Sequence, residues 1–281
     1  MRAIRPQWMT VLTIGCAAVL AACAPESNEM ADDAPQAAAP TPAPAPATVS
    51  VTPPQPEPES VDMNIPDVIT ADRGGFVPEG IEYDRANGRF LTGSLADGSI
   101  YEVGLDGSVT AFIMDPALVS SVGIEADEAR DRLLVTNSNA AVFGMPLGNP
   151  DGPPQAQLGA YSLTTGERLA MVDLAAEVNA GDDAVFFAND VAVADDGTAY
   201  VTDTRQNVVY RVGTDYDVSI HYAFDAIEGL ALNGIEWHED GYLIVADLGN
   251  GRFYKVTTSG RADADMIAVP EALAGADGLV W

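Results

Sequence analysis

One pattern returns five times along the chain and constrains the fold more than any other feature. In each copy the first residue is followed by Gly or Asp and then by an aliphatic residue. The first residues are Glu79, Val122, Asn189, Asn233 and Asp277. The copies are about 44 residues apart, except for the second and third, between which Ala140–Gln157 form an insertion rich in Gly, Pro and Asn. A regular period of this length indicates a repeat architecture.

Short apolar runs separated by turn pairs fill each copy. The pairs include Asn87-Gly88, Asp97-Gly98, Asp106-Gly107, Asp196-Gly197, Asp240-Gly241 and Asn250-Gly251. Such pairs supply the positive φ angles that tight hairpins require. The runs predict strands at Arg89–Gly93, Ser99–Val103, Arg132–Thr136, Ala199–Thr202, Val208–Val212, Tyr242–Ala246 and Arg252–Val256. Only Asp173–Val178 and Pro270–Ala274 are expected to be helical.

Four strands within roughly 40–50 residues are typical of one β-propeller blade. The sequence therefore predicts an all-β chain with a six-bladed β-propeller. The fifth copy ends at Trp281, one strand after it begins, so we expect a propeller truncated within the fifth blade. Ile65–Thr70 is expected to complete the last blade. A smaller ring, or a partner that covers the open strand edge, is the alternative.

The N-terminus has the pattern of an exported protein. Arg2 and Arg5 precede an apolar run from Trp8 to Ala22, which is short for a membrane span. The run ends in Leu20-Ala21-Ala22-Cys23, which resembles the lipobox of bacterial lipoproteins. We therefore predict a signal peptide over residues 1–22, a lipidated Cys23 with a Pro/Ala-rich linker over 23–60, and the propeller domain over 61–281. Ala24, where an aspartate would indicate inner-membrane retention, favours an outer-membrane anchor facing the periplasm.

The charge balance excludes several partners. The chain has 13 Lys and Arg against 42 Asp and Glu, a formal net charge of −29. Nucleic-acid binding needs a clustered basic surface, and adhesion to anionic lipid needs basic segments. We therefore expect a small-molecule partner, no nucleic acid, and membrane contact only through the lipid anchor.

At four of the five first positions of the repeat, the side chain contains oxygen. In a propeller the inner strands line the central channel, so residues at one repeat position meet at one place. Two carboxylates and two amides form an oxygen-only set that suits Ca²⁺, whereas zinc prefers His or Cys. The candidate metal ligands are Glu79, Asn189, Asn233 and Asp277. Asn and Asp before Gly are also common turn residues, so a structural role is the alternative.

Four motifs resemble the family of senescence marker protein 30, gluconolactonase and luciferin-regenerating enzyme. They are Pro78-Glu79-Gly80-Ile81, Phe187-Ala188-Asn189-Asp190-Val191, Leu232-Asn233-Gly234-Ile235 and Ala276-Asp277-Gly278-Leu279. The resemblance implies a six-bladed propeller with a divalent metal, usually Ca²⁺, in its central tunnel. It also implies the same four ligands, with Asp277 as general base or nucleophile.

The function expected from this resemblance is metal-dependent hydrolysis of a lactone or related ester. The metal would polarise the substrate carbonyl. Asp277 would take a proton from the attacking water or attack the carbonyl carbon itself. Two alternatives stay open. The chain could be a non-catalytic, lipid-anchored binding or assembly module, or a phosphoester hydrolase that uses the same site.

Overall fold

The computed structural model describes residues 65–181 and 183–280. The chain divides into two units, residues 1–59 and 60–281. The predicted signal peptide, the lipidation site Cys23 and the whole predicted linker lie outside the described residues. In the part of the chain that is described, no helix is long and apolar enough to cross a membrane.

The described residues form four antiparallel sheets of four strands, each built from consecutive strands. The first two sheets contain β1 (Pro78–Asp84), β2 (Arg89–Ser94), β3 (Ile100–Val103), β4 (Val109–Ile113), β5 (Ser120–Asp127), β6 (Arg132–Ser138), β7 (Ala156–Ser162) and β8 (Arg168–Asp173). The other two contain β9 (Ala188–Val193), β10 (Ala199–Asp203), β11 (Val208–Val212), β12 (Val218–Ala223), β13 (Leu232–His238), β14 (Tyr242–Asp247), β15 (Arg252–Thr257) and β16 (Ala264–Ile267). The all-β prediction and the predicted strands are confirmed.

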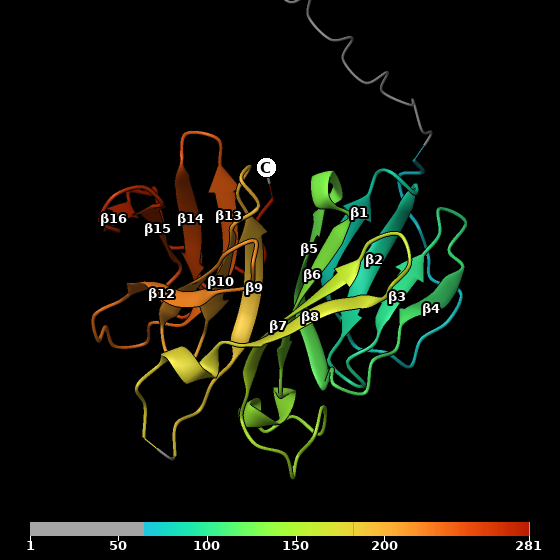
Figure 1. Cartoon of the computed structure of the whole chain (residues 1–281), viewed down its shortest axis with the longest axis horizontal. Helices are drawn as coiled ribbons and strands as arrows, with labels where there is room; N and C mark the ends of the chain where they lie inside the picture. The colour runs from blue at the N-terminus through green and yellow to red at the C-terminus, as the bar shows by residue number, and fades with distance from the viewer. Residues whose placement is uncertain (1–64, 182, 281) are drawn as a thin grey trace, which may run out of the picture. The chain divides into compact units, whose positions relative to one another are not determined.

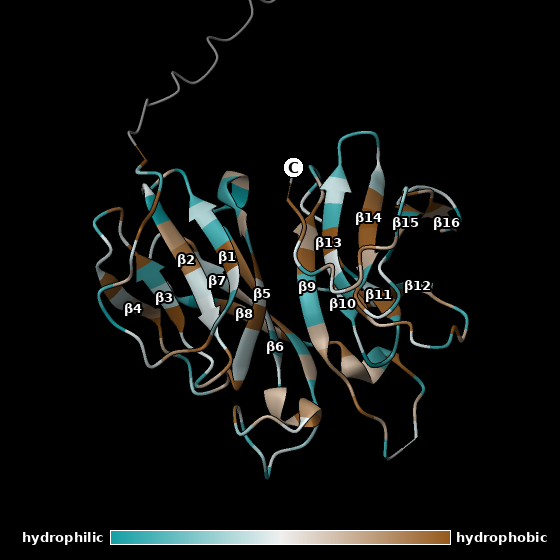
Figure 2. Ribbon diagram, turned by 180° about the vertical axis from the view of Figure 1, so that it is seen from behind, coloured by the Kyte–Doolittle hydropathy of each residue, from teal (hydrophilic) through white to brown (hydrophobic). Residues whose placement is uncertain are grey.

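The first strands of successive sheets are neighbours, so β1 lies beside β5, β5 beside β9 and β9 beside β13 (Figure 1). We call β1, β5, β9 and β13 the inner strands. In the fourth sheet the middle strand β14 is more apolar than the inner strand β13, as the brown β14 and the teal parts of β13 show (Figure 2). All seven residues of β6 are buried, because this strand is covered by sheets on both sides.

Three apolar cores fill the spaces between successive sheets. One contains Leu91 and Leu133, from the first two sheets, and another contains Leu158 and Tyr210, from the second and third. The last joins the third and fourth sheets and includes Leu243. Each sheet is thus stabilised mainly by apolar burial against its neighbours. This packing of sheet faces is that of a propeller.

The predicted turn glycines adopt the conformation that their pairs require. All six have a positive φ, namely Gly88, Gly98, Gly107, Gly197, Gly241 and Gly251. The helical predictions were less accurate. Within Asp173–Val178 only Ala175–Glu177 form a short 3-10 helix (η3).

Two segments differ from the sequence prediction because they contact other parts of the fold. Residues 268–280 form bends and turns without a helix or strand. In this segment the Leu273 amide donates to the Gly251 carbonyl at 2.9 Å. Ile65–Thr70 does not complete the last sheet. Its last residue lies against the first sheet, since the Thr70 carbonyl oxygen is 2.2 Å from where a Cβ at Gly107 would lie, and the nearby Asp72 amide donates to the Gly107 carbonyl at 2.8 Å. The fourth sheet takes all its strands from residues 232–267, and the total of six blades stays a prediction.

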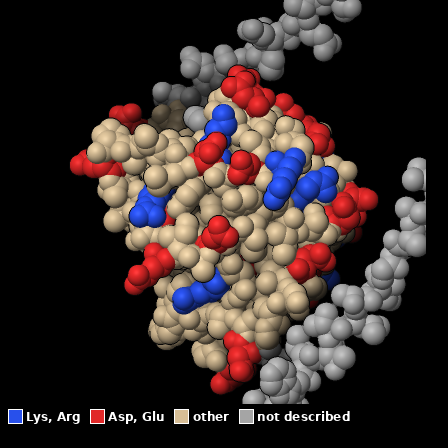
Figure 3. Space-filling view, turned by 90° about the vertical axis from the view of Figure 1, so that its left-hand side faces the viewer, with Lys and Arg blue, Asp and Glu red and all other residues tan. Residues whose placement is uncertain are grey.

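The surface charge is distributed over the sheets. Figure 3 shows Asp and Glu side chains spread over one face of the protein, with Lys and Arg side chains between them. This face therefore carries both signs of charge rather than one basic patch.

Candidate functional site

Every inner strand has a β-bulge at the beginning of its repeat motif. The strand register shifts between Glu79 and Ile81, between Ser121 and Ile124, and between Leu232 and Ile235. Opposite β9, the shift lies between Val201 and Asp203 of β10. Bulges re-aim side chains and are common beside active sites. In this protein the bulges lie at equivalent points of the four sheets, next to the first residue of each repeat copy.

The glycine after the first residue allows adjacent inner strands to approach closely. A Cβ at Gly80 would lie 2.3 Å from the Val122 carbonyl oxygen, and one at Gly123 would lie 2.7 Å from that of Asn189. The fifth copy forms no strand, but it approaches β13 just as closely. A Cβ at Gly234 would lie 2.2 Å from the Asp277 carbonyl oxygen. The backbone of Asp277 therefore follows the inner strands in the same sequence of contacts.

A cavity of about 760 Å³ brings the four predicted ligands together. Its wall includes Glu79, Asn189, Asn233 and Asp277. The two amides are buried, with Asn189 6% and Asn233 5% exposed. Glu79 is partly buried and Asp277 is exposed. The structure thus assembles the four side chains at one place, and their role as metal ligands stays a prediction.

The two asparagines are held differently. Asn189 donates from Nδ2 to the Thr204 hydroxyl at 2.8 Å, and its backbone carbonyl accepts from the Thr136 hydroxyl at 2.6 Å. The Asn233 carbonyl accepts from the Thr202 hydroxyl, also at 2.6 Å. The Asn233 side chain makes no hydrogen bond within the described residues, so its amide is available to a ligand in the cavity.

Asp190 is a site residue that the sequence analysis did not select. Its carboxylate accepts from the amides of Val191 at 3.0 Å and Ile235 at 3.1 Å. It therefore joins the third and fourth sheets beside Asn189. Burial raises the pKa of Asp190 to about 7 in spite of these two hydrogen bonds, and the charges of Glu236 and Asp277 add to the rise.

Crowding of carboxylates also affects Glu79. Burial raises its pKa to about 7, and the charges of Asp277 and Asp190 contribute in the same direction. Carboxylates that raise one another's pKa lie close together without compensating positive charge. A bound cation would supply that charge.

A second set of carboxylates lies along the same wall. Glu82, Glu125 and Glu236 occupy the fourth position of three repeat copies, and all three line the cavity. We call them the glutamate belt. Burial is the main cause that raises the pKa of Glu82 to about 7, that of Glu125 well above its ordinary value, and that of Glu236 as well. The aligned repeat contained this signal, because the three glutamates share one position.

The belt and the first positions make the cavity strongly acidic. Arg85 is the only Lys or Arg among the described residues that line it. The positive charge of Arg85 lowers the pKa of Glu82, but less than burial raises it. The cavity therefore presents an excess of carboxylates to any bound molecule.

The donor set fits a hard cation that accepts amide oxygens. Within residues 65–181 and 183–280, no group of three or more His, Cys, Asp and Glu side chains is arranged to hold a metal ion. A cation would therefore need the amide oxygens of Asn189 and Asn233 beside the carboxylates of Glu79 and Asp277. Mixed carboxylate and amide ligation is common for Ca²⁺.

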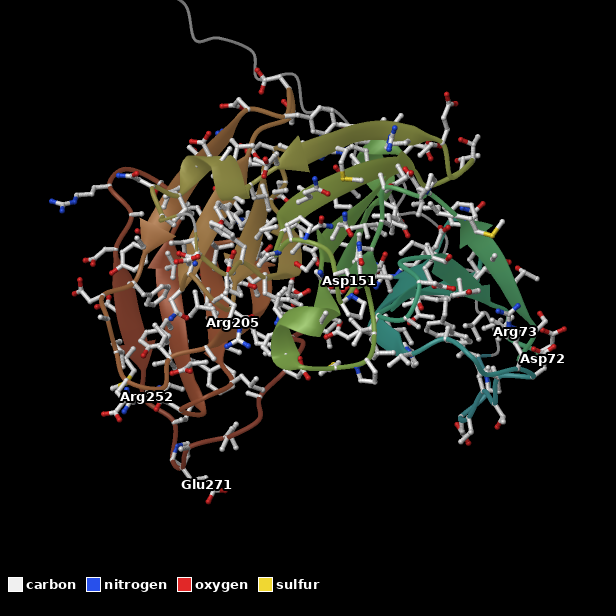
Figure 4. All side chains as sticks on the ribbon, turned by 90° about the horizontal axis from the view of Figure 1, so that it is seen from below. Asp72, Arg73, Asp151, Arg205, Arg252 and Glu271 are labelled. Carbon is white, nitrogen blue, oxygen red and sulfur yellow. The ribbon has the colours of Figure 1, made fainter. Side chains whose placement is uncertain are left out.

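The insertion lies close to the third sheet but does not line the cavity. Phe143, in the short helix η2 (Ala140–Phe143), packs edge-on against Phe187 with ring centres 4.5 Å apart. The guanidinium of Arg205 lies 4.2 Å from the Phe143 ring centre, and Figure 4 labels Arg205 beside this short helix. Asn139 is buried and bonded to the backbone of the insertion, including the Asn149 carbonyl at 2.8 Å. These hydrogen bonds stabilise the turn that opens the insertion.

Solved structures resemble the chain in fold. The major allergen Mala s 1 of Malassezia sympodialis is 16% identical, with a TM-score of 0.59, over 72% of this chain and 67% of that one. A luciferin-regenerating enzyme is 17% identical, with a TM-score of 0.53, over 73% and 66%. A gluconolactonase from Xanthomonas campestris is also 17% identical, with a TM-score of 0.51, over 74% and 66%.

The chain has the β-propeller fold of these proteins. It spans about two thirds of the length of each. No protein-family model matches the sequence, and no curated protein matches it. At these identities the likeness describes the architecture of the propeller, while its chemistry depends on the residues of the cavity.

Proposed function

We propose that the protein is a Ca²⁺-dependent hydrolase of an uncharged lactone or related ester. The observation that carries this proposal is the assembly of Glu79, Asn189, Asn233 and Asp277 around one cavity, each from an equivalent point of its repeat. A binding module has no need to collect oxygen ligands at one register. The similarity in fold to a gluconolactonase supports the same reaction class.

The side chains divide into two roles. The carboxylate of Glu79 and the amide oxygens of Asn189 and Asn233 would hold the cation, with Asp277 completing the set. Bound there, Ca²⁺ would supply a positive charge that polarises the substrate carbonyl. Asp277, the most exposed of the four, would also take a proton from the attacking water.

The charge of the wall favours an uncharged substrate. The glutamate belt and Asp190 lie in the same cavity as the proposed cation site, with Arg85 as the only basic side chain among the described lining residues. Where these carboxylates are ionised, they would repel phosphoesters that bear an ionised oxygen, whereas a lactone carries no charge. The belt also offers acceptors for the hydroxyl groups of a sugar lactone. These observations favour the lactone over the phosphoester.

The proposed location is the outer membrane, facing the periplasm, with the propeller attached through a lipidated Cys23. The lipobox pattern of Leu20-Ala21-Ala22-Cys23 supports it. Expression of the full chain with a radiolabelled fatty acid tests the proposal. The label should enter the wild type but not Cys23→Ser, and an equally labelled variant would contradict the anchor.

The enzymatic proposal is tested by Ca²⁺ titration calorimetry and by a pH-drop assay on a panel of sugar and alkyl lactones. Glu79→Gln, Asn233→Ala and Asp277→Asn should each weaken Ca²⁺ binding at least tenfold and abolish most of the turnover. Glu271→Gln is the control, since Glu271 is exposed and outside the cavity (Figure 4). Ca²⁺ binding without hydrolysis of any lactone would favour the binding module. Equal Ca²⁺ binding by all four variants would contradict the metal site.

A further inference from the structure

The hydroxyl of Thr204 connects one proposed ligand to the next sheet. It donates to the backbone carbonyl of Leu232 at 2.6 Å, and Asn189 donates from Nδ2 to the same hydroxyl oxygen at 2.8 Å. Thr204 is 7% exposed, Asn189 6% and Leu232 0%. The three groups therefore form a short chain of hydrogen bonds that runs from the cavity wall of β9 to the start of β13.

The direction of these bonds follows from a count of protons. A threonine hydroxyl has one proton, and a carbonyl oxygen can only accept. The proton of Thr204 is therefore directed to Leu232, and its oxygen must accept from Asn189. Only the NH₂ end of the Asn189 amide can donate, so its oxygen faces away from Thr204. Asparagine orientation is usually ambiguous, but here the carbonyl of Leu232 decides it.

The second sheet offers a comparison at the same register. Ser138, the last residue of β6, occupies the position in the second sheet that Thr204 occupies just after β10 in the third. Its hydroxyl donates to the Ala188 carbonyl at 2.8 Å. The first residue of that repeat is Val122, whose side chain has no amide group. The hydroxyl at this register thus joins two sheets in both cases, and only Thr204 also contacts a polar first-position side chain.

We propose that Thr204 is a positioning residue that holds the Asn189 amide with its oxygen toward the cavity and thereby sets the cation affinity of the site. This inference rests on the proposed cation site. Without the hydroxyl, the amide can rotate and present NH₂ to the cavity, where it would repel a cation. Groups that orient metal ligands typically change metal affinity 10–100-fold when they are removed.

The test compares three full-length variants by Ca²⁺ titration calorimetry and urea unfolding. Thr204→Val keeps the shape but removes the hydroxyl, and we expect its Ca²⁺ affinity to fall 10–100-fold. Thr204→Ser restores the hydroxyl and should bind within about threefold of wild type. Ser138→Ala removes the corresponding bond between sheets, so it should lose stability as Thr204→Val does and keep its Ca²⁺ affinity within about threefold.

A metal-free measurement separates this inference from the proposed function. In the NMR spectrum of the wild type without Ca²⁺, the Asn189 side-chain NH₂ should show nuclear Overhauser contacts to Thr204 and slowed hydrogen exchange. Absence of both would overturn the inference, whether or not Thr204→Val folds. Wild-type affinity in Thr204→Val, or an equal loss in Ser138→Ala, would overturn it too. A wild type that shows the NMR contacts but binds no Ca²⁺ would contradict the proposed function and the affinity role of Thr204 while supporting the hydrogen-bond direction.

Discussion

Arg132 and Asp127 form a buried ion pair in which Nη2 lies 2.6 Å from Oδ2. The same nitrogen of Arg132 donates to the Gly197 carbonyl, in the turn between β9 and β10 of the next sheet, at 2.9 Å. Arg89 repeats the arrangement one sheet earlier, with Asp84 and the Leu163 carbonyl. One guanidinium thus satisfies a carboxylate in its own sheet and fixes that sheet against its neighbour.

Removal of the Arg132 guanidinium should destabilise the protein. Arg132→Met leaves Asp127 buried with only Arg130, 3.1 Å away, as a charged partner. We expect a loss of about 2–4 kcal/mol in the free energy of unfolding, measured by urea denaturation. Arg168→Met is the control, because Arg168 pairs with Asp115 while 47% exposed, and it should cost less than about 1 kcal/mol. Equal losses in the two variants would contradict the proposed role of burial.

Gly123 should not tolerate a side chain. An added Cβ would lie 2.5 Å from Oδ1 of Asp190 and 2.7 Å from the Asn189 carbonyl oxygen. Gly123→Ala should therefore separate β5 from β9, with a loss of about 1–3 kcal/mol in stability. It should also weaken Ca²⁺ binding, because Asn189 moves. Gly74→Ala, where nothing lies within 4 Å, is the control for both measurements. An unchanged melting temperature in Gly123→Ala would contradict the close approach of the strands.

Stability without added metal should fall as pH rises from 5 to 8. The pKa of Glu82 is about 7 in the folded protein, above its ordinary value of 4.5, so the folded state binds more protons in this range. Stability is therefore greatest below the ordinary pKa and is lost as pH rises through 7. In Glu82→Gln, the free energy of unfolding should fall by on the order of 1–2 kcal/mol less over this pH range than in the wild type. Melting temperatures measured across the range test the prediction, with the exposed Glu167→Gln as control. A pH profile identical to wild type in Glu82→Gln would refute it.

Substrate charge should control turnover. The glutamate belt lines the cavity, so at a pH above 7, where its carboxylates become ionised, a lactone that bears a phosphate should react with a kcat/KM at least tenfold below that of its uncharged parent, at low salt. A triple variant should reduce the difference in kcat/KM between the two lactones, chiefly through a lower KM for the phosphorylated one. It combines Glu82→Gln, Glu125→Gln and Glu236→Gln. Equal turnover of the two lactones by the wild type would contradict selection by charge.

Several features of the fold could be predicted from local sequence alone. Asn-Gly and Asp-Gly pairs predicted the hairpins because only a few residues tolerate a positive φ, and Gly88 and Gly197 have it. The helix predicted at Pro270–Ala274 does not form, and the reason lies in a tertiary contact. The Leu273 amide bonds to the Gly251 carbonyl, a partner that a reading of the local sequence cannot reveal.

The site was predictable where its residues share a repeat position. Glu79, Asn189, Asn233 and Asp277 share the first position and do line one cavity. Asp190 was not selected because it replaces the glycine of the other copies. Its place became evident only from its contact with the Ile235 amide.

The sequence by itself determined the repeat, the strands and the turns, since backbone geometry and apolar periodicity are local properties. It also determined which residue types recur at each register. Only the tertiary structure decided what these residues meet. The acidity of the cavity and the orientation of Asn189 by Thr204 depend on side chains from different sheets, which come together only when apolar burial packs those sheets face to face.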